Sequence, residues 1–217
     1  MTASLPRTIA GIEIPDTPLV RATTAFIRDA EDDLLFDHSR RVFLFGALQG
    51  RRLGMTPDLE VLYVGAMFHD LGLTEPYRSS SKLRFEVDGA NAARDFALEH
   101  GADEATARKV WLGIALHTTP GVPVFLDPEI ALVTAGVETD VLGIGRDDLP
   151  ADARDAVLAA HPRLDFKRRI LQAFADGVRQ RPESTFGTVN ADVLAHVDPS
   201  FVRGDFVEVI RSNGWPE

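Results

Sequence analysis

The sequence has 217 residues, of which 45% are hydrophobic, and it carries a formal net charge of −10. This length supports one hydrophobic core, and the negative charge argues against nonspecific binding to nucleic acid or to an acidic membrane, because phosphate groups would repel the chain. The absence of cysteine excludes disulfides, thiolate metal sites and cysteine nucleophiles, so a metal ion would bind through histidine nitrogen and carboxylate oxygen.

The N-terminal residues 1–18 contain three prolines, at positions 6, 15 and 18, and predict an irregular arm. They contain no apolar run of the length of a signal peptide, and no later apolar run is long enough to span a bilayer. We therefore expect a cytoplasmic protein that does not insert into membranes.

Helix signals then follow one another along the chain. Thr17 and Pro18 suit the N-cap and the first position of a helix, and Thr56 and Pro57 repeat this pattern for a helix that Gly72 would end. The middle of this later helix is apolar on nearly every side, which predicts a buried central helix. The other helices are expected over about residues 37–53, 85–101, 103–118, 127–141, 151–161, 165–181 and within 200–215, with a loop at 75–84.

No segment shows the alternating pattern of a series of strands, so the sequence predicts an all-α protein. We divide the chain into the N-terminal arm (1–18), a helical domain (19–181) and a C-terminal helical extension (182–217). The apolar residues of the extension have near-helical spacing, so we expect it to pack on the same domain or to form a contact between copies in a homo-oligomer.

Four of the predicted helices place a polar side chain suited to metal binding on an apolar stripe. His38, His117 and Asp140 each continue such a stripe, and the pair His69 and Asp70 lies near the end of the central helix. Each of them alone could be a core residue with one hydrogen bond. Several inward-pointing histidines and carboxylates in one small core suggest that they converge on an ion.

The order of these residues resembles that in the HD-domain superfamily, whose members are metal-dependent hydrolases with an all-helical core. The similar segments are FDHSRRVFLFG, YVGAMFHDLGL and VETDVLG, within about residues 35–145. The resemblance implies a helical bundle around a central metal site, with His38, His69, Asp70 and Asp140 as ligands. Two imidazoles and two carboxylates suit one divalent ion; we expect zinc first, with iron, manganese or magnesium as alternatives.

A larger set of segments is similar to the cyanamide hydratase-like branch of this superfamily. That branch implies a single zinc that activates water for attack on a small nitrile-type carbon, and hence a small-molecule substrate. Many HD phosphodiesterases instead resemble the pattern His-Asp-Ile-Gly-Lys, whose lysine helps to hold phosphate, and Leu73 stands at that lysine position here. The segments that carry the closer resemblance are DHSRRVFLFG, FHDLGL, RFEVDGANAARDF, GIALHT, GVETDVLG and HPRLDFKRRI.

The candidate catalytic residues are Asp70, Glu86 and His117, which could take a proton from water and return it to the substrate. His117 could also orient the site or contact the substrate. Glu86 could instead favour the first turn of its helix, where acidic residues are stabilising.

The candidate substrate-binding residues are Arg41, Tyr77 and Thr118. Arg41 could bind an anionic substrate or form a structural ion pair with an acid. Tyr77 belongs to a loop that could cover the pocket, and Thr118 could hydrogen-bond a polar substrate or the end of its own helix.

Two alternative functions stay open at this stage. Arg41, Arg78 and Lys82 are compatible with a phosphohydrolase that acts on a nucleotide or another phosphate ester. A non-catalytic helical protein with a structural metal would instead show a closed site with four protein ligands.

Overall fold

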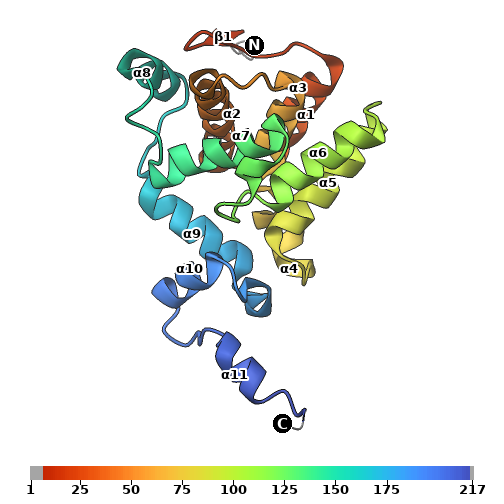
Figure 1. The fold of residues 1–217 in the computed structure, drawn as a ribbon, viewed down its shortest axis with the longest axis vertical. Helices are drawn as coiled ribbons and strands as arrows, with labels where there is room; N and C mark the ends of the chain where they lie inside the picture. The colour runs from red at the N-terminus through yellow and green to blue at the C-terminus, as the bar shows by residue number, and fades with distance from the viewer. Residues whose placement is uncertain (1–6, 216–217) are drawn as a thin grey trace.

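The computed structural model describes residues 7–215, which form an all-α fold (Figure 1). The only strands among these residues are the two of one short hairpin. This confirms the fold class that the sequence predicts. In chain order the elements are β1 (Thr8–Ile9), β2 (Ile12–Glu13), α1 (Pro18–Ala30), α2 (Asp33–Leu53), α3 (Leu59–Phe68), η1 (Leu71–Leu73), α4 (Tyr77–Ser80), α5 (Phe85–Glu99), α6 (Glu104–Ala115), η2 (Pro123–Phe125), α7 (Pro128–Val137), η3 (Glu138–Leu142), α8 (Ala151–Ala160), α9 (Phe166–Val178), η4 (Pro182–Thr185), α10 (Asn190–Val197) and α11 (Phe206–Arg211).

Helix α3 is the centre of the fold. Every side chain from Val61 to Phe68 is buried, and α1, α2, α5, α6 and α7 all pack against this helix. A helix that is apolar on all sides requires such cover on all sides, and the structure confirms the predicted central helix. Within residues 7–215, neither this helix nor another one combines the length and hydropathy needed to cross a membrane.

The first two long helices begin where side chains cap them. Thr17 accepts a hydrogen bond from the backbone N–H of Val20 (3.2 Å), as predicted for the start of α1. Helix α2 begins earlier than residue 37, because Asp32 accepts a hydrogen bond from the N–H of Leu35 (3.0 Å) and caps it.

The limits of α3 differ from the prediction at both ends. Asp58, and not Thr56, is the N-cap, since its carboxylate accepts from the backbone N–H groups at the start of the helix. The helix ends at Phe68, before Gly72, and His69 is its C-cap residue. The early end matters for the site, because His69 and Asp70 lie where the regular helix stops.

The N-terminal arm is more regular than predicted where the structure describes it. β1 and β2 form an antiparallel hairpin, and Ile9 and Ile12 are buried against the core. Ala10 and Gly11 both have positive φ angles, of 50° and 73°, as a two-residue hairpin turn requires. So short a hairpin leaves no periodic signal in the sequence. Residues 1–6 of the predicted arm lie outside the described residues.

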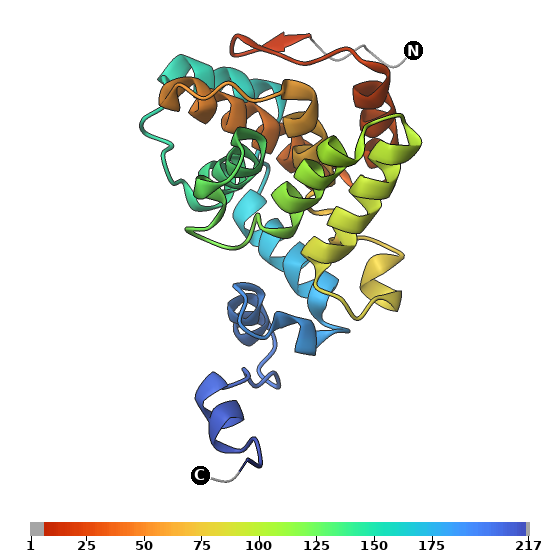
Figure 2. The same ribbon diagram turned by 45° about the vertical axis from the view of Figure 1, so that its right-hand side comes forward.

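The C-terminal extension also differs from the prediction. It contains a helix that the sequence did not indicate, α10, which packs against α9. Beyond it α11 extends away from the helical body in both views (Figures 1 and 2), and its apolar side chains are half exposed or more: Phe206, Val207, Val209 and Ile210. These side chains of α11 are therefore not buried within one chain, and the alternative, a contact between copies of the chain, stays a prediction.

Helices α2 and α7 approach each other closely because glycine faces the partner helix on both sides. A Cβ atom at Gly136 would lie 2.1 Å from the backbone oxygen of Val42, and one at Gly46 would lie 2.5 Å from the backbone oxygen of Leu132. The backbones themselves are in contact, so no side chain can move aside to make room. This contact fixes α7, and the turn η3 that follows it, against the middle of α2.

We predict that Gly136→Ala lowers the free energy of unfolding by about 1–3 kcal/mol or more, since the added methyl must push two helix backbones apart. The matched control is Gly113→Ala in α6, where the nearest atom to the new Cβ is 3.5 Å away and the higher helix propensity of alanine should be neutral or stabilising. Urea denaturation followed by circular dichroism measures both. Equal stability of the two variants would contradict the tight packing of α2 and α7.

Candidate metal centre

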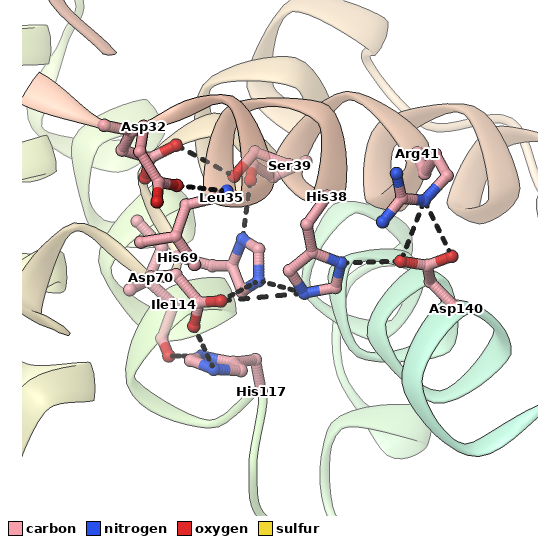
Figure 3. A network of polar contacts seen from close by, with 12 residues as sticks. Asp32, Leu35, His38, Ser39, Arg41, His69, Asp70, Ile114, His117 and Asp140 are labelled. Atoms are coloured by element: carbon pink, nitrogen blue, oxygen red, sulfur yellow. Dashed lines mark hydrogen bonds and ion pairs between the residues drawn. The ribbon is translucent and has the colours of Figure 1, made fainter. Parts of the chain in front are cut away.

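Four polar residues of the core form a cluster where α2, the end of α3 and the end of α6 converge (Figure 3). His38 comes from the first third of α2, and His117 follows the last turn of α6. Gly89 of α5 lets that helix approach the end of α3, because a Cβ there would lie 2.9 Å from the backbone oxygen of Phe68. All four side chains of the cluster are buried: His38, His69, Asp70 and His117.

Each of the three histidine rings is held by a hydrogen bond at its Nδ1 atom. Each of these nitrogens faces a group that can only accept a hydrogen bond, so each Nδ1 carries a proton and Nε2 is the nitrogen that can bind a metal ion or a second proton. His38 donates to Oδ2 of Asp140 (2.7 Å), His69 to the carbonyl of Ala66 (2.7 Å) and His117 to the carbonyl of Ile114 (2.6 Å).

The Nε2 atoms surround the carboxylate of Asp70 (Figure 3). Nε2 of His69 lies 3.3 Å and Nε2 of His38 lies 3.6 Å from Asp70 Oδ2, and Nε2 of His117 lies 3.8 Å from Oδ1. Both Asp70 oxygens are buried, and neither has a hydrogen-bond partner. A buried carboxylate without partners, facing nitrogen lone pairs, requires a cation.

The donor atoms of His38, His69 and Asp70 fit a divalent metal ion. They lie within 4.8 Å of one another, and the two Nε2 atoms are 3.2 Å apart. Two nitrogens bound to one tetrahedral ion at about 2.0–2.1 Å would be about 3.3 Å apart. The cluster could therefore hold one divalent ion with three protein ligands.

The electrostatics of the metal-free cluster agree with this assignment. Burial lowers the pKa of His38 and lowers that of His117 to about 4, so both rings are neutral at pH 7. Burial also lowers the pKa of His69, but the charge of Asp70 together with the hydrogen bonds to Asp70 and Ala66 outweighs it, so the pKa of that ring is raised. Burial opposes the ionisation of Asp70, yet the surrounding histidines lower its pKa to about 2. A proton on His69 thus supplies the positive charge when no metal does.

Asp140 is not placed as the resemblance implied. It lies in the π-helical turn η3, on the Nδ1 side of the His38 ring and away from the Nε2 atoms. Its oxygens also accept hydrogen bonds from Nε of Arg41 (2.9 and 3.1 Å) and from Arg163. Helical spacing predicts that Asp140 points inward, but it does not tell which nitrogen of His38 it meets. From this position Asp140 accepts the Nδ1 proton of His38 and can orient that ring.

Arg41 forms the structural ion pair that was one of its two expected roles. The side chain is buried, pairs with Asp140, and donates to the backbone carbonyls of His161 (3.3 Å) and Pro162 (3.0 Å). These contacts use Nε and Nη1 of Arg41, whereas its Nη2 is buried and has no partner among the described residues. Arg163 supports the same carboxylate, and no sequence signal connects these residues, because they come from distant parts of the chain.

Glu86 and Thr118 meet beside His117. The buried Glu86 carboxylate accepts hydrogen bonds from Nη2 of Arg84 (2.8 Å) and from the hydroxyl of Thr118. Burial raises the pKa of Glu86, but Arg84, His117 and Thr118 lower it by more, so the group is ionised. Thr118 is thus held by a protein partner next to the cluster.

Tyr77 lies at the start of α4 and is half-buried. Burial and the charges of Asp88 and Asp95 on α5 raise the pKa of its hydroxyl, which places it beside that helix. Among the contacts of the described residues, none joins Tyr77 to the histidine cluster. The predicted loop at 75–84 contains α4, and Tyr77 packs on the core there.

Comparison with known proteins supports the site. The family model described as HD domain matches residues 35–159, a range that includes the three histidines, Asp70 and Asp140. A search of curated proteins finds no match.

Because His69 is protonated in the metal-free protein and His38 and His117 are not, we predict that metal binding near pH 6.5 releases about one proton. The number should fall towards zero as the pH rises above the raised pKa of His69, and metal affinity should weaken as the pH falls below it. Calorimetric titration with zinc in buffers of different ionisation enthalpy measures the proton count. Release of two or three protons at pH 6.5 would contradict the neutral state of His38 and His117.

We predict that Asp140→Asn weakens metal binding by about 10–100-fold, since the neutral amide no longer fixes the His38 ring. Asp147→Asn, at an exposed carboxylate, is the control and should bind metal as the wild type does. Competition with a colorimetric chelator measures the affinities, with circular dichroism as the check of folding. A complete loss of the ion in a folded Asp140→Asn would mean that Asp140 is a ligand after all.

Proposed function

The chain belongs to the HD-domain family, and from this membership we propose that it is a metal-dependent hydrolase or hydratase acting on a small polar molecule, with a cyanamide- or nitrile-like compound as the substrate to test first. The observation that carries the proposal is the set of three protein ligands with a fourth nitrogen, Nε2 of His117, beside it. Catalytic metal sites keep a position free for water or substrate, and structural ones fill all four with protein ligands.

The expected ion is zinc. Two imidazole nitrogens and one carboxylate suit zinc, and iron, manganese and magnesium are the alternatives to test. A bound divalent ion would lower the pKa of water towards ~7 and polarise the atom under attack.

His117 is the proposed proton carrier. Its Nδ1–H donates to the carbonyl of Ile114, so Nε2 is the nitrogen that can accept a proton, and it faces Asp70 across 3.8 Å. Burial keeps the ring neutral at pH 7, so it is ready to accept a proton from water and to return it to the substrate nitrogen. The Ile114 contact and the edge of the Phe85 ring hold the imidazole in this orientation.

Glu86 and Thr118 support His117 and are not proposed to transfer protons themselves. The Glu86 carboxylate is ionised and already accepts hydrogen bonds from Arg84 and Thr118. Its charge would stabilise the protonated form of His117, and its hold on Thr118 fixes the chain that follows the ring. This changes Glu86 from a candidate proton donor into a positioning residue.

A small, uncharged substrate fits the surroundings of the cluster better than a phosphate ester does. Leu73 is buried where a phosphate-binding lysine would be expected from the resemblance. Three arginines near the site already pair with carboxylates: Arg41 with Asp140, Arg78 with Glu75 and Arg84 with Glu86. These pairs neutralise the charge of each arginine, which weakens the attraction of the site for a phosphate.

The burial of the cluster favours one other function, a structural metal. The side chains of His38, His69 and Asp70 are almost inaccessible to solvent, and a structural ion would be closed off in this way. If His117 moved slightly it would complete four protein ligands. The two functions differ in whether small molecules reach the metal.

The test combines metal content with turnover. Elemental analysis of the wild type and of His69→Ala, purified in parallel, should give about one equivalent of metal in the former and none in the latter. The loaded protein is then assayed with cyanamide, with small nitriles and with a phosphate ester. Turnover of the first group supports the proposal. Two equivalents of metal together with phosphate-ester cleavage would replace it with the phosphohydrolase, and one equivalent without any turnover would favour the structural metal.

For the reaction itself, we predict that His117→Asn lowers kcat by about 10²–10⁴-fold while metal content is unchanged, since a proton carrier and not a ligand is removed. His100→Asn, at an exposed histidine at the end of α5, is the matched control and should keep full activity. Loss of the metal in His117→Asn would show that His117 is a ligand.

A further inference from the structure

A cleft of about 560 Å³ opens on the side of the molecule where α9 crosses the junction of α1 and α2. One wall is α9, the second is the α1–α2 junction, and the third is the segment from η1 to α4. The residues that the inference uses are Asp32 and Leu35 at the junction, Leu73 and Glu75 after η1, and Arg169 and Ala173 on α9.

The inner end of this cleft is one layer of side chains from the metal centre. Leu34 and Leu35 line the cleft and pack with Phe166 of α9, and the Phe166 ring lies 5.2 Å from the ring of His38. His38 is one helical turn beyond Leu35, so both face the same side of α2. Leu73, on the opposite wall, follows Asp70 by a single turn of η1. Leu35 and Phe166 therefore lie between one wall of the cleft and His38, and Leu73 lines the opposite wall close to Asp70 in the chain.

The cleft is polar but carries no excess charge. Three arginines and three carboxylates line it: Arg78, Arg168, Arg169, Asp32, Glu75 and Asp176. Each arginine has an acidic partner, Arg78 with Glu75 (2.7 Å), Arg168 with Asp165 (2.5 Å) and Arg169 with Asp32 (3.9 Å). A surface of paired charges offers hydrogen bonds without attracting either sign of ion.

One buried polar group without a full set of partners lies beside the cleft wall, at the C-cap of α1. Glu31 is flanked by Ala30 and Asp32 of the cleft wall, but its side chain turns inward, and Oε2 meets the hydroxyl of Ser39 at 3.5 Å. Oε1 is buried and has no partner. Burial, and then the charges of Asp70 and Asp32, raise the pKa of Glu31 well above its usual range, which favours the protonated carboxyl, the form that can donate a hydrogen bond.

We infer that this cleft is the route by which a small, uncharged polar ligand reaches the metal centre, that Leu35, Leu73 and Phe166 are its gate, and that Glu31 hydrogen-bonds the ligand at the inner end. The inference rests on the proposed function, because it assigns the substrate class and the entrance of that same site. It also explains how a cluster so well buried can act on a substrate: the gate consists of apolar side chains, which can change rotamer without breaking a hydrogen bond.

The test follows ligand binding and does not depend on turnover. Cobalt(II) replaces the native ion, and its visible spectrum reports the arrival of cyanamide or of inorganic phosphate in a stopped-flow instrument. Ala173→Phe fills the cleft and should slow the binding of cyanamide about tenfold, whereas Leu35→Ala should speed it by a similar factor. Leu171→Phe, outside the cleft on the same helix, is the matched control and should leave the rate unchanged.

The two variants are expected to change the binding rate in opposite directions. A loss of stability in both variants would instead increase the rate in both, so the test still distinguishes the two explanations. The cyanamide rate should not change between about 0.05 and 0.5 M salt, since an uncharged ligand is not steered by charge. Equal rates in Ala173→Phe and the control, or no spectral response to cyanamide in the wild type, would overturn the inference. Binding of cyanamide through the cleft without hydration would instead leave the route intact and refute the proposed reaction.

The role of Glu31 has its own test. Glu31→Leu should raise the Kd of cyanamide for the cobalt protein about tenfold, the equivalent of one lost hydrogen bond, and Glu31→Gln should restore it because the amide can still donate. Metal content should stay at the wild-type level in both. Equal Kd values for Glu31→Leu and the wild type would remove Glu31 from the ligand site.

Discussion

The buried carboxylate of Asp70 is the feature on which the rest of the site depends. Neither of its oxygens has a hydrogen-bond partner, and three imidazole nitrogens face it from three directions. Such an arrangement is unstable without a positive charge at its centre. In the metal-free protein a proton on His69 supplies that charge, and a divalent ion would supply it more fully. The burial of the cluster and its metal chemistry thus have one electrostatic origin.

The fold holds this arrangement through backbone contacts more than through flexible side chains. Backbone carbonyls of α3 and α6 orient His69 and His117. The glycine contact between α2 and α7 brings the turn η3 against α2, so that Asp140 meets His38. Arg41 and Arg163 then fix Asp140. Each of the three imidazoles is therefore held by a group that is itself fixed by the helices, which preorganises the site.

The sequence predicted the helices and the converging residues because helical spacing records which face of a helix is buried. It could not predict contacts that depend on how helices are placed. Asp140 was expected beside the metal, but only the structure shows which nitrogen of His38 it meets. Glu31 lies in a run of acidic residues at the α1–α2 junction, and such a run is typical of a solvent-exposed surface, although Glu31 itself is buried. Helix α10 is too short for a clear signal, and the apolar spacing of α11 does not tell whether its face packs within one chain or against another copy.

We infer that one divalent ion binds between His38, His69 and Asp70, with Asp140 outside its ligand set. A crystal structure of the zinc-loaded protein, with anomalous diffraction measured at the zinc edge, tests this most directly. We predict a single anomalous peak in contact with Nε2 of His38, Nε2 of His69 and an oxygen of Asp70, with Asp140 still on Nδ1 of His38. A peak bonded to Asp140, or no peak at this cluster, would contradict the account.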